Sequence, residues 1–274
     1  MILINGQPAD QISAQDRGLH YGDGLFETIA VKNGTPLLWD RHMQRLGLGC
    51  SRLGIEPPDP ALLRAETEQL CAGVERAVLK IIITRGAGGR GYRPSPLTSH
   101  PLSATRIVAR YPWPEWPQRF WQEGVRVRIC RTPLGANPSL AGIKHLNRLE
   151  QVLARSEWDD PDIPEGLMLD QAGSVIEATM SNLFIVRGGR LLTPDLSVCG
   201  VAGIVRACII EIAAKLSIPC TVTRLTLADV QSAEEGFLCN SLIGLWPIRE
   251  IAGTVLKPGP VTALVYDYIQ IHSA

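Results

Sequence analysis

The sequence predicts a mixed α/β protein, because strand patterns and helix patterns alternate along its 274 residues. Residues 25–31 (LFETIAV) and 77–84 (AVLKIIIT) are rich in β-branched and apolar side chains, which favours strands within a sheet. Apolar residues recur at helical spacing over 43–53 and again over 204–216, which favours helices with one buried face. We therefore expect sheets and helices in both halves of the chain.

The N-terminal part begins with short strands and turns. Asn33-Gly34 follows the strand over 25–31, and this pair is typical of a hairpin turn. Asp40 is the expected N-cap of the next helix. The buried stripe expected on that helix consists of Met43, Leu46, Cys50 and Leu53. Residues 85–101 form a long loop rich in glycine and proline, and a loop of this length is often functional.

A proline-rich stretch marks the best domain boundary. Residues 112–117 (PWPEWP) contain three prolines in six positions, which favours an extended connection. We expect an N-terminal domain over 1–113, a linker over 114–123 and a C-terminal domain over 124–274. The C-terminal domain should contain further strands, including a hairpin over 182–193, and a final helix near the end.

Composition excludes several classes of function. The chain has 27 basic and 27 acidic residues and a pI near 7, so it lacks the basic surplus that nucleic acid or an anionic membrane surface requires. No apolar run approaches membrane-spanning length, and the N-terminus does not resemble a signal peptide, so we expect a cytoplasmic protein. The seven cysteines form no CxxC pair and the five histidines show no ligand spacing, so we expect no metal site.

Lys144 is the first candidate for chemistry. Only five lysines occur beside 22 arginines, and Lys144 lies where a loop gives way to a helix pattern. That helix is expected to bury Leu146, Leu149, Val152 and Leu153, leaving Arg148, Glu150 and Gln151 in solvent. A desolvated lysine amine attacks carbonyl groups and forms Schiff bases, although the spacing alone also fits a solvated charge. Lys80, in the strand over 77–84, ranks second because a strand lysine usually reaches toward solvent.

Two features of the C-terminal half also carry a possible function. Glu177 lies in an apolar strand pattern (SVIEAT); such carboxylates mostly face solvent, but a buried one needs a partner. Gly200 and Gly203 precede a helix and leave its first N–H groups approachable, which favours a phosphate site. Every helix has such an end, so this signal is weak by itself. The glycines of 86–91 show neither a Gly-Lys-Ser/Thr ending nor Rossmann spacing.

Taken together, these segments resemble the fold-type-IV family of pyridoxal-phosphate enzymes, and the resemblance covers nearly the whole chain. The family includes branched-chain aminotransferases, D-amino-acid aminotransferases and aminodeoxychorismate lyases. The matching motifs run in the family's order: YGDGLFET (21–28), HMQRL (42–46), AGIKHLNRLEQVL (141–153), EATMSNLF (177–184) and GVAGIVR (200–206). The thirteen-residue run around Lys144, together with ITRGAGGRGY (83–92), is most similar to the aminodeoxychorismate lyases.

The resemblance implies a homodimer of two-domain chains, with pyridoxal 5'-phosphate in the interdomain cleft and a partly barrel-like sheet in the C-terminal domain. It implies that Lys144 binds the cofactor as a Schiff base. It also implies that Glu177 meets the pyridine nitrogen and keeps it protonated. The phosphate would be held by the Arg45 side chain and the amides of Ile204 and Val205, with Ser241 as a further hydroxyl.

The implied reaction converts 4-amino-4-deoxychorismate into 4-aminobenzoate and pyruvate, a step of folate biosynthesis. Lys144 would remove the proton from the carbon that bears nitrogen, after which the enolpyruvyl ether leaves. Thr28 would assist proton transfer, or is an ordinary β-branched strand residue. Arg106 and Arg93, the latter in the loop over 90–93, are candidates for binding the substrate carboxylates, although Arg106 also fits a surface strand position.

An aminotransferase on the same scaffold is the main alternative. Aminotransferases of this family commonly have an arginine shortly after the Phe/Tyr-Glu pair, whereas Phe26-Glu27 is followed here by Thr28-Ile29-Ala30. This difference favours the lyase. A binding protein that lost catalysis would be expected to lack the lysine, the glutamate or the cradle arginine, and all three are present.

Overall fold

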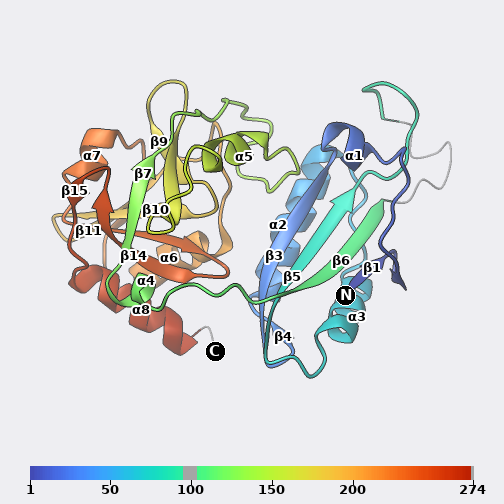
Figure 1. The fold of residues 1–274 in the computed structure, drawn as a ribbon, viewed down its shortest axis with the longest axis horizontal. Helices are drawn as coiled ribbons and strands as arrows, with labels where there is room; N and C mark the ends of the chain where they lie inside the picture. Colours follow the sequence, from blue (N-terminus) through green and yellow to red (C-terminus); the bar gives the residue numbers. More distant parts are fainter. Residues whose placement is uncertain (95–103, 273–274) are drawn as a thin grey trace. The chain divides into compact units, whose positions relative to one another are not determined.

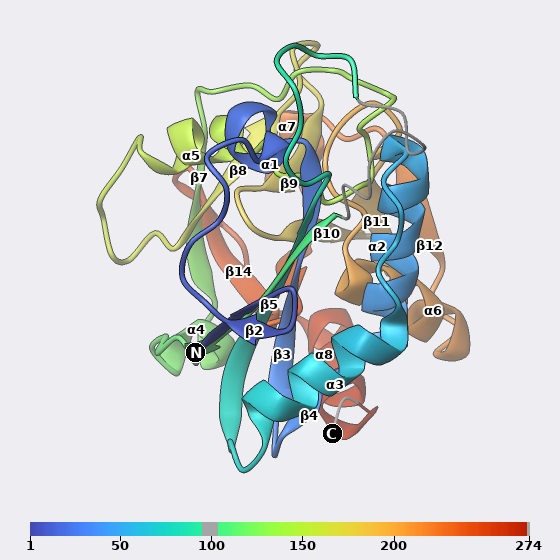
Figure 2. The same ribbon diagram turned by 90° about the vertical axis from the view of Figure 1, so that its right-hand side faces the viewer.

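The structure, a computed structural model, describes residues 1–94 and 104–272 and confirms the mixed α/β fold (Figures 1 and 2). The chain divides into two compact units. Unit 1 consists of Met1–Pro114 and Ile143–Asn147, and unit 2 consists of Glu115–Gly142 and Arg148–Ala274. Within the described residues, no helix is both long enough and apolar enough to cross a membrane.

Unit 1 is built on an antiparallel sheet with strand order β2-β1-β6-β5-β3-β4. Its strands are β1 (Ile2–Ile4), β2 (Gln7–Pro8), β3 (Gly24–Lys32), β4 (Thr35–Pro36), β5 (Arg76–Thr84) and β6 (Thr105–Pro112). Its helices are α1 (Arg17–Tyr21), α2 (Trp39–Leu53) and α3 (Pro60–Cys71). Helix α2 packs on β3 and α3 packs on β6, so one face of the sheet is covered (Figures 1 and 2).

Alternation along β3 decides which side chains meet that helical layer. Leu25, Glu27, Ile29 and Val31 are all buried, whereas Phe26 and Thr28 on the opposite face are only half-buried. Helix α2 begins at Trp39 and buries His42, Leu46, Gly49 and Cys50, so the predicted stripe is correct at two positions and misses a histidine.

Unit 2 contains a nine-stranded mixed sheet in the order β12-β11-β10-β13-β14-β7-β8-β9, with β15 paired to β14. Its strands are β7 (Val125–Ile129), β8 (Glu165–Leu169), β9 (Val175–Ala178), β10 (Asn182–Arg187), β11 (Arg190–Pro194), β12 (Cys220–Thr223), β13 (Glu235–Asn240), β14 (Gly244–Ile251) and β15 (Thr254–Val255). Strand β9, at one end of this order, also contacts β10 and β11, so the sheet curls back on itself.

The helices of unit 2 are α4 (Arg119–Gln122), α5 (Leu149–Arg155), α6 (Ile204–Lys215), α7 (Leu227–Gln231) and α8 (Pro260–His272). Helices α6 and α8 pack on β13 and on each other. Trp246 on β14 is fully buried and meets the rings of Trp116, Phe120 and Trp121 edge-on. The segment proposed from composition as a linker, 114–123, therefore contains a short helix and contributes to the core of unit 2.

The helix after Lys144 differs from its prediction. Helix α5 begins only at Leu149, and its apolar side chains are exposed: Leu149 by 67%, Val152 by 57% and Leu153 by 52%. Gln151, predicted in solvent, is buried. The apolar spacing correctly marked one face of the helix, but within the single chain that face is not the one that packs against the core.

Candidate active site

The lysine segment is paired through its backbone with the start of β3 and does not form the start of a helix. The Phe26 amide donates to the Lys144 carbonyl at 2.9 Å, and the Leu146 amide donates to the Gly24 carbonyl at 2.9 Å. This ladder runs antiparallel to the start of β3. Two backbone hydrogen bonds from a buried strand fix the position from which the Lys144 side chain projects.

The Lys144 amine lies beside an aromatic ring. Its Nζ is 4.4 Å from the centroid of Phe26, and Nζ of Lys80 is 5.3 Å from the same centroid. Thr28 is paired with Lys80 in the register of β3 and β5, and alternation puts it on the same face as Phe26. The half-buried face of the unit 1 sheet therefore brings together the two lysines weighed from the sequence and the predicted Thr28 hydroxyl.

The other face of the same sheet holds a buried charge cluster. Glu27, only 1% exposed, accepts hydrogen bonds from His42 Nδ1 at 2.7 Å and from Arg45 Nε at 2.8 Å. Burial raises the pKa of the Glu27 carboxyl, but the charge of Arg45 and the hydrogen bonds from His42 and Arg45 lower it by more, so its pKa lies below the ordinary value. The predicted phosphate ligand Arg45 is thus fixed in orientation by a carboxylate.

Arg106 lies on the covered face of the sheet. It is paired with Ile83 on β5, so it shares the face of Glu27 and not that of Phe26. Its Nε donates to both Glu66 oxygens on α3, at 3.0 and 2.8 Å. Arg106, predicted to bind a substrate carboxylate, is thus paired with a carboxylate on α3, as Arg45 is paired with Glu27 on β3.

Arg93 is exposed and belongs to the part of the long loop that the structure describes, 85–94. The rest of that predicted loop, up to 101, lies outside the described residues. The carbonyl groups of Gly91 and Tyr92, immediately before Arg93, accept hydrogen bonds from Arg17 at 2.9 and 3.0 Å. The backbone that leads to Arg93 is therefore fixed by a side chain 74 residues away.

In unit 2, Glu177 is buried on β9, with 5% of its surface exposed. Its Oε2 accepts the amide of Val201 at 2.8 Å, and the side-chain nitrogen of Asn182 lies 3.5 Å away. The same Asn182 nitrogen donates to the Val201 carbonyl at 3.0 Å. A buried carboxylate with one oriented amide donor is a suitable partner for a protonated heterocyclic nitrogen.

The N-terminus of α6 follows shortly after Val201 in the chain. The helix is twelve residues long and begins after Gly203 without a side-chain cap. A Cβ at Gly203 would lie 2.0 Å from Asn182 Oδ1, so only glycine fits there. Ile204 and Val205, whose amides were predicted to bind phosphate, are the first residues of this helix. The dipole of a helix of this length favours an anion at that end.

Ser241 lies in the turn that connects β13 and β14. Asn240 organises this turn, because its Oδ1 accepts the amides of Leu242 and Ile243 at 2.8 and 2.9 Å. The Asn240 nitrogen donates to the Met180 carbonyl at 3.1 Å, which joins the turn to the connection between β9 and β10. Ser241 is thus placed at the same end of the sheet as Glu177.

Sequence reasoning missed several polar residues that position these groups. His42 stands three residues before Arg45 on α2, a spacing that indicates a shared helix face. Asn182 follows five residues after Glu177 and was read only as part of a hairpin. Arg17 was not singled out from the sequence. In each case the interaction partner can be identified only when the strand register or the position of a distant loop is known.

Comparison with known proteins decides the family. The family model described as amino-transferase class IV matches residues 24–251. The chain belongs to the aminotransferase class IV family. Enzymes of this family depend on pyridoxal phosphate, so the predicted cofactor is confirmed for the family.

Similar proteins within class IV include both lyases and aminotransferases, the two activities predicted from the sequence. Aminodeoxychorismate lyase of Vibrio harveyi is 36% identical over 92% of each chain. A crystal structure of 4-amino-4-deoxychorismate lyase from Pseudomonas aeruginosa is 47% identical, covers 99% of each chain and has a TM-score of 0.93. A putative branched-chain-amino-acid aminotransferase of Methanocaldococcus jannaschii is 30% identical over 93% of this chain and 89% of its own. The likeness to the lyases is the stronger one.

Proposed function

We propose that this class IV enzyme is an aminodeoxychorismate lyase, which converts 4-amino-4-deoxychorismate to 4-aminobenzoate and pyruvate. The observation that carries the proposal is the unbroken run AGIKHLNRLEQVL around Lys144, supported by full-length likeness to two lyases at 36% and 47% identity. Further support comes from the anchored backbone of Lys144 beside Phe26, since a paired segment holds a reactive amine in a defined place.

The residues present fit pyridoxal phosphate. Glu177 offers a buried carboxylate to the pyridine nitrogen, and Gly203 lets the Asn182 side chain, which contacts Glu177, pack against the start of α6. The phosphate would be held by groups whose charge and hydrogen-bonding capacity match it: Arg45, the amides of Ile204 and Val205, and the Ser241 hydroxyl. When bound, the cofactor supplies an electron sink for the electron pair left after deprotonation of the substrate carbon.

The side chains then have separate tasks in the elimination. Lys144, the residue that would bind the cofactor covalently, takes the proton from the substrate carbon that bears nitrogen through its freed Nζ. Glu177 keeps the pyridine nitrogen protonated. The carbon–oxygen bond to the enolpyruvyl group breaks, the ring becomes aromatic, and Thr28 Oγ1 passes a proton toward the leaving group, which ends as pyruvate. Arg93 binds one of the two substrate carboxylates.

Two lysines at one ring allow a sharp test of the central residue. Borohydride reduction of the cofactor-loaded protein, followed by peptide mass mapping, should place the cofactor on the peptide that contains Lys144. Lys144→Ala should lose both turnover and the visible absorbance of the bound cofactor. The matched variant Lys80→Ala should keep that absorbance. Cofactor trapped on Lys80, or full activity in Lys144→Ala, would contradict the assignment.

The competing activity is transamination of D-alanine or of branched-chain amino acids, which the 30% identical relative favours. A side-by-side assay separates the two. One reaction contains aminodeoxychorismate and is read for 4-aminobenzoate and pyruvate, and the other contains an amino donor with 2-oxoglutarate. We expect fast lyase turnover and slow transamination. The reverse result would keep the cofactor site and change the substrate.

We also propose that the enzyme is a cytoplasmic homodimer that acts in folate biosynthesis. Support for a second copy comes from α5, whose Leu149, Val152 and Leu153 form an exposed apolar face in the single chain. Light scattering after gel filtration should give about twice the chain mass of 29.9 kDa. The double variant Leu149→Glu, Leu153→Glu tests whether α5 contributes: a shift toward the monomer mass supports this, and an unchanged dimer excludes it.

A further inference from the structure

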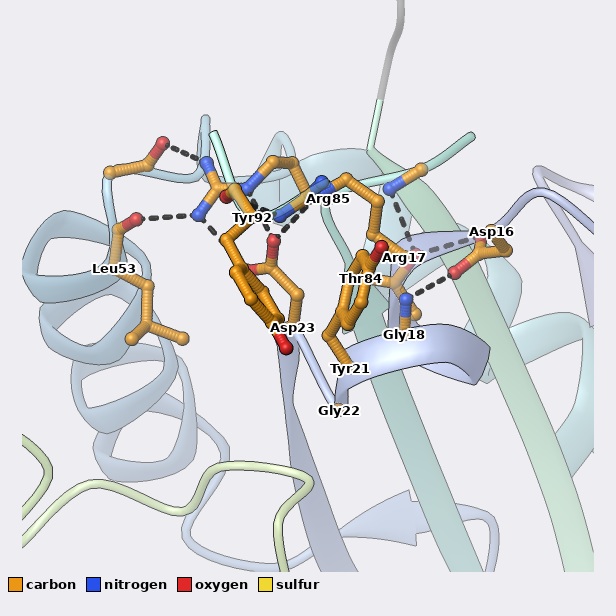
Figure 3. A network of polar contacts seen from close by, with 12 residues as sticks. Asp16, Arg17, Gly18, Tyr21, Gly22, Asp23, Leu53, Thr84, Arg85 and Tyr92 are labelled. Carbon is orange, nitrogen blue, oxygen red and sulfur yellow. Dashed lines mark hydrogen bonds and ion pairs between the residues drawn. The ribbon is translucent and has the colours of Figure 1, made fainter. Parts of the chain in front are cut away.

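A partly buried aspartate at the start of β3 is held by two arginines (Figure 3). Arg17 Nε and Arg85 Nε each donate to Asp23 Oδ2 at 2.8 Å, and Arg85 Nη2 donates to Oδ1 at 3.0 Å. Burial raises the pKa of Asp23, but the hydrogen bonds and charges of Arg85 and Arg17 lower it by more. The carboxylate is therefore ionised, and it fixes the orientation of both guanidinium groups.

Arg17 uses its remaining nitrogens to hold the 85–94 loop. Nη1 donates to the Gly91 carbonyl at 2.9 Å. Nη2 donates to the carbonyl of Tyr92, which lies near Arg17 in Figure 3, at 3.0 Å. The guanidinium carbon lies 4.9 Å from the centroid of Tyr21, and the whole residue is only 5% exposed. A planar fork with donors on three sides can meet a carboxylate and two carbonyls at once, which a single ammonium cannot.

Polar and ring contacts hold this loop beside a cavity. A cavity of about 390 Å³ lies between α1 and the loop, and its lining consists of Gln15, Arg17, His20, Tyr21 and residues 87–90. Further contacts come from Tyr21, whose hydroxyl accepts the Gly91 amide at 3.3 Å and whose ring lies 5.5 Å from that of Tyr92. Backbone hydrogen bonds from Arg17 to Gly86 and from Gly88 to Gln15 hold the base of the loop, so the Arg17 side chain and Tyr21 mainly determine the position of residues 91–92.

The same stretch of chain also supports the lysine segment. Asp23 is followed by Gly24, whose carbonyl accepts the Leu146 amide at 2.9 Å. One residue before Asp23, the Gly22 carbonyl accepts the side-chain nitrogen of Asn147 at 3.1 Å. Asp23 therefore holds the loop that carries Arg93 through Arg17, and the next residue, Gly24, holds the segment that carries the reactive amine.

We propose that Arg17 is a positioning residue, which with Asp23 fixes the Gly91–Tyr92 backbone so that Arg93 binds a substrate carboxylate. The inference rests on the proposed function for the identity of that substrate. Arg17 itself does not touch substrate, because its three nitrogen positions are engaged with Asp23 and the loop. Its loss should weaken binding of the substrate more than it slows the chemical step.

The kinetic test is a double-mutant cycle of Arg17→Lys and Arg93→Met in the cofactor-loaded enzyme. Arg17→Lys keeps the charge beside Asp23 but loses the fork, and we expect KM to rise about tenfold while kcat changes by less than about threefold. In the Arg93→Met background, Arg17→Lys should add almost nothing, because the carboxylate contact is already lost. Additive effects on KM would overturn the proposal.

A structural test needs no turnover. Trypsin cleaves after an arginine unless proline follows, so Arg90 is a cleavable site in this loop, whereas Arg93 is followed by Pro94. Cleavage after Arg90, measured by mass spectrometry, should be faster in Arg17→Lys and in Arg17→Met than in the unsubstituted enzyme, with no loss of bound cofactor. Unchanged cleavage in both variants would show that Arg17 does not hold the loop.

Arg187→Lys provides a matched control. Arg187 also pairs with an aspartate and a backbone carbonyl, both of Asp229, but it lies in unit 2 on β10. This variant should leave both KM and the cleavage rate after Arg90 unchanged. If the lyase assay gives no product at all, the trypsin result still decides whether Arg17 holds the loop, and the cycle is repeated with the carboxylate substrate of the transamination assay.

Discussion

Glu165 predicts an unusual dependence of stability on pH. This carboxyl is fully buried on β8, and Oε1 accepts the Thr179 hydroxyl at 3.1 Å. Its Oε2 has no hydrogen-bond partner among the described residues. Burial raises the pKa of Glu165 from 4.5 to about 8; the bond from Thr179 lowers it only in part, and the charge of Glu177 raises it slightly. Glu165 is therefore protonated in the folded enzyme at neutral pH.

The sign of the effect follows from proton binding. Between pH 4.5 and 8 the folded state retains a proton that the unfolded state releases, so the free energy of unfolding falls as pH rises. Each pKa unit corresponds to about 1.4 kcal/mol, so a rise from 4.5 to about 8 corresponds to at most about 5 kcal/mol over that range. The Glu165 contribution is fully present below pH 4.5 and lost as pH passes about 8.

Glu165→Gln keeps the shape of the neutral acid but cannot ionise. Urea midpoints and Tm of the two proteins, both loaded with cofactor, are compared at pH 5, 6, 7 and 8. The variant should match the unsubstituted enzyme at pH 5 and exceed it increasingly toward pH 8. A difference between the two proteins that stays constant with pH would refute the reasoning.

Glu157→Gln is the contrasting control for this series. Glu157 accepts the amides of Arg131 and Thr132 and the Thr132 hydroxyl at 2.8 to 3.0 Å. Burial raises its pKa, but these hydrogen bonds lower it by more. Its stabilising contribution is therefore present at neutral pH and lost as pH falls. The Gln variant should be less stable than the unsubstituted enzyme at pH 7, with a difference that shrinks in acid.

Two further substitutions test the supports of the cofactor site. Gly203→Ala would put a Cβ 2.0 Å from Asn182 Oδ1, so we expect a loss of about 1–3 kcal/mol and weaker retention of pyridoxal phosphate, followed by dialysis and absorbance. Gly47→Ala, on α2 where nothing lies within 4 Å of the new Cβ, should be neutral or stabilising, and equal losses in both variants would contradict the close contact. Glu27→Gln leaves the charge of Arg45 buried without its carboxylate, so thermal unfolding should show a loss of roughly 3–5 kcal/mol. A change below about 1 kcal/mol would mean that the pair adds little.

The strands at the centre of unit 1 were predictable because their pattern is local. The prediction over 25–31 corresponds to β3 (Gly24–Lys32), and that over 77–84 corresponds to β5 (Arg76–Thr84). Both are long runs of β-branched and apolar residues, and these residue types alone predict strands that are buried on one or both faces. The cofactor was predicted from the family motifs, because the periodicity of apolar residues carries no information about a bound cofactor.

The segment around Lys144 was mispredicted because a distant strand determines its conformation. Helical spacing over 146–153 was real, but backbone pairing with β3 holds the first residues and delays the helix to Leu149. For a related reason, the pairing of Arg106 with Glu66 was not predicted. Which face of a strand a residue occupies depends on register, and neither the register with β5 nor the position of Glu66 can be read from the local sequence.

Asp23 and Gly24 are adjacent, and each makes a close contact with a distant part of the chain. A Cβ at Gly24 would lie 2.4 Å from the Ile83 carbonyl, so β3 must begin with glycine to approach β5 this closely. The close approach also brings Arg85, which follows β5, within reach of Asp23, at a sequence separation of 62 residues. The backbone of β3 holds the lysine segment, and the Asp23 side chain orients Arg17, which holds the loop. The close antiparallel pairing of β3 with β5 therefore supports both the segment of the proposed base and the loop of the proposed carboxylate ligand.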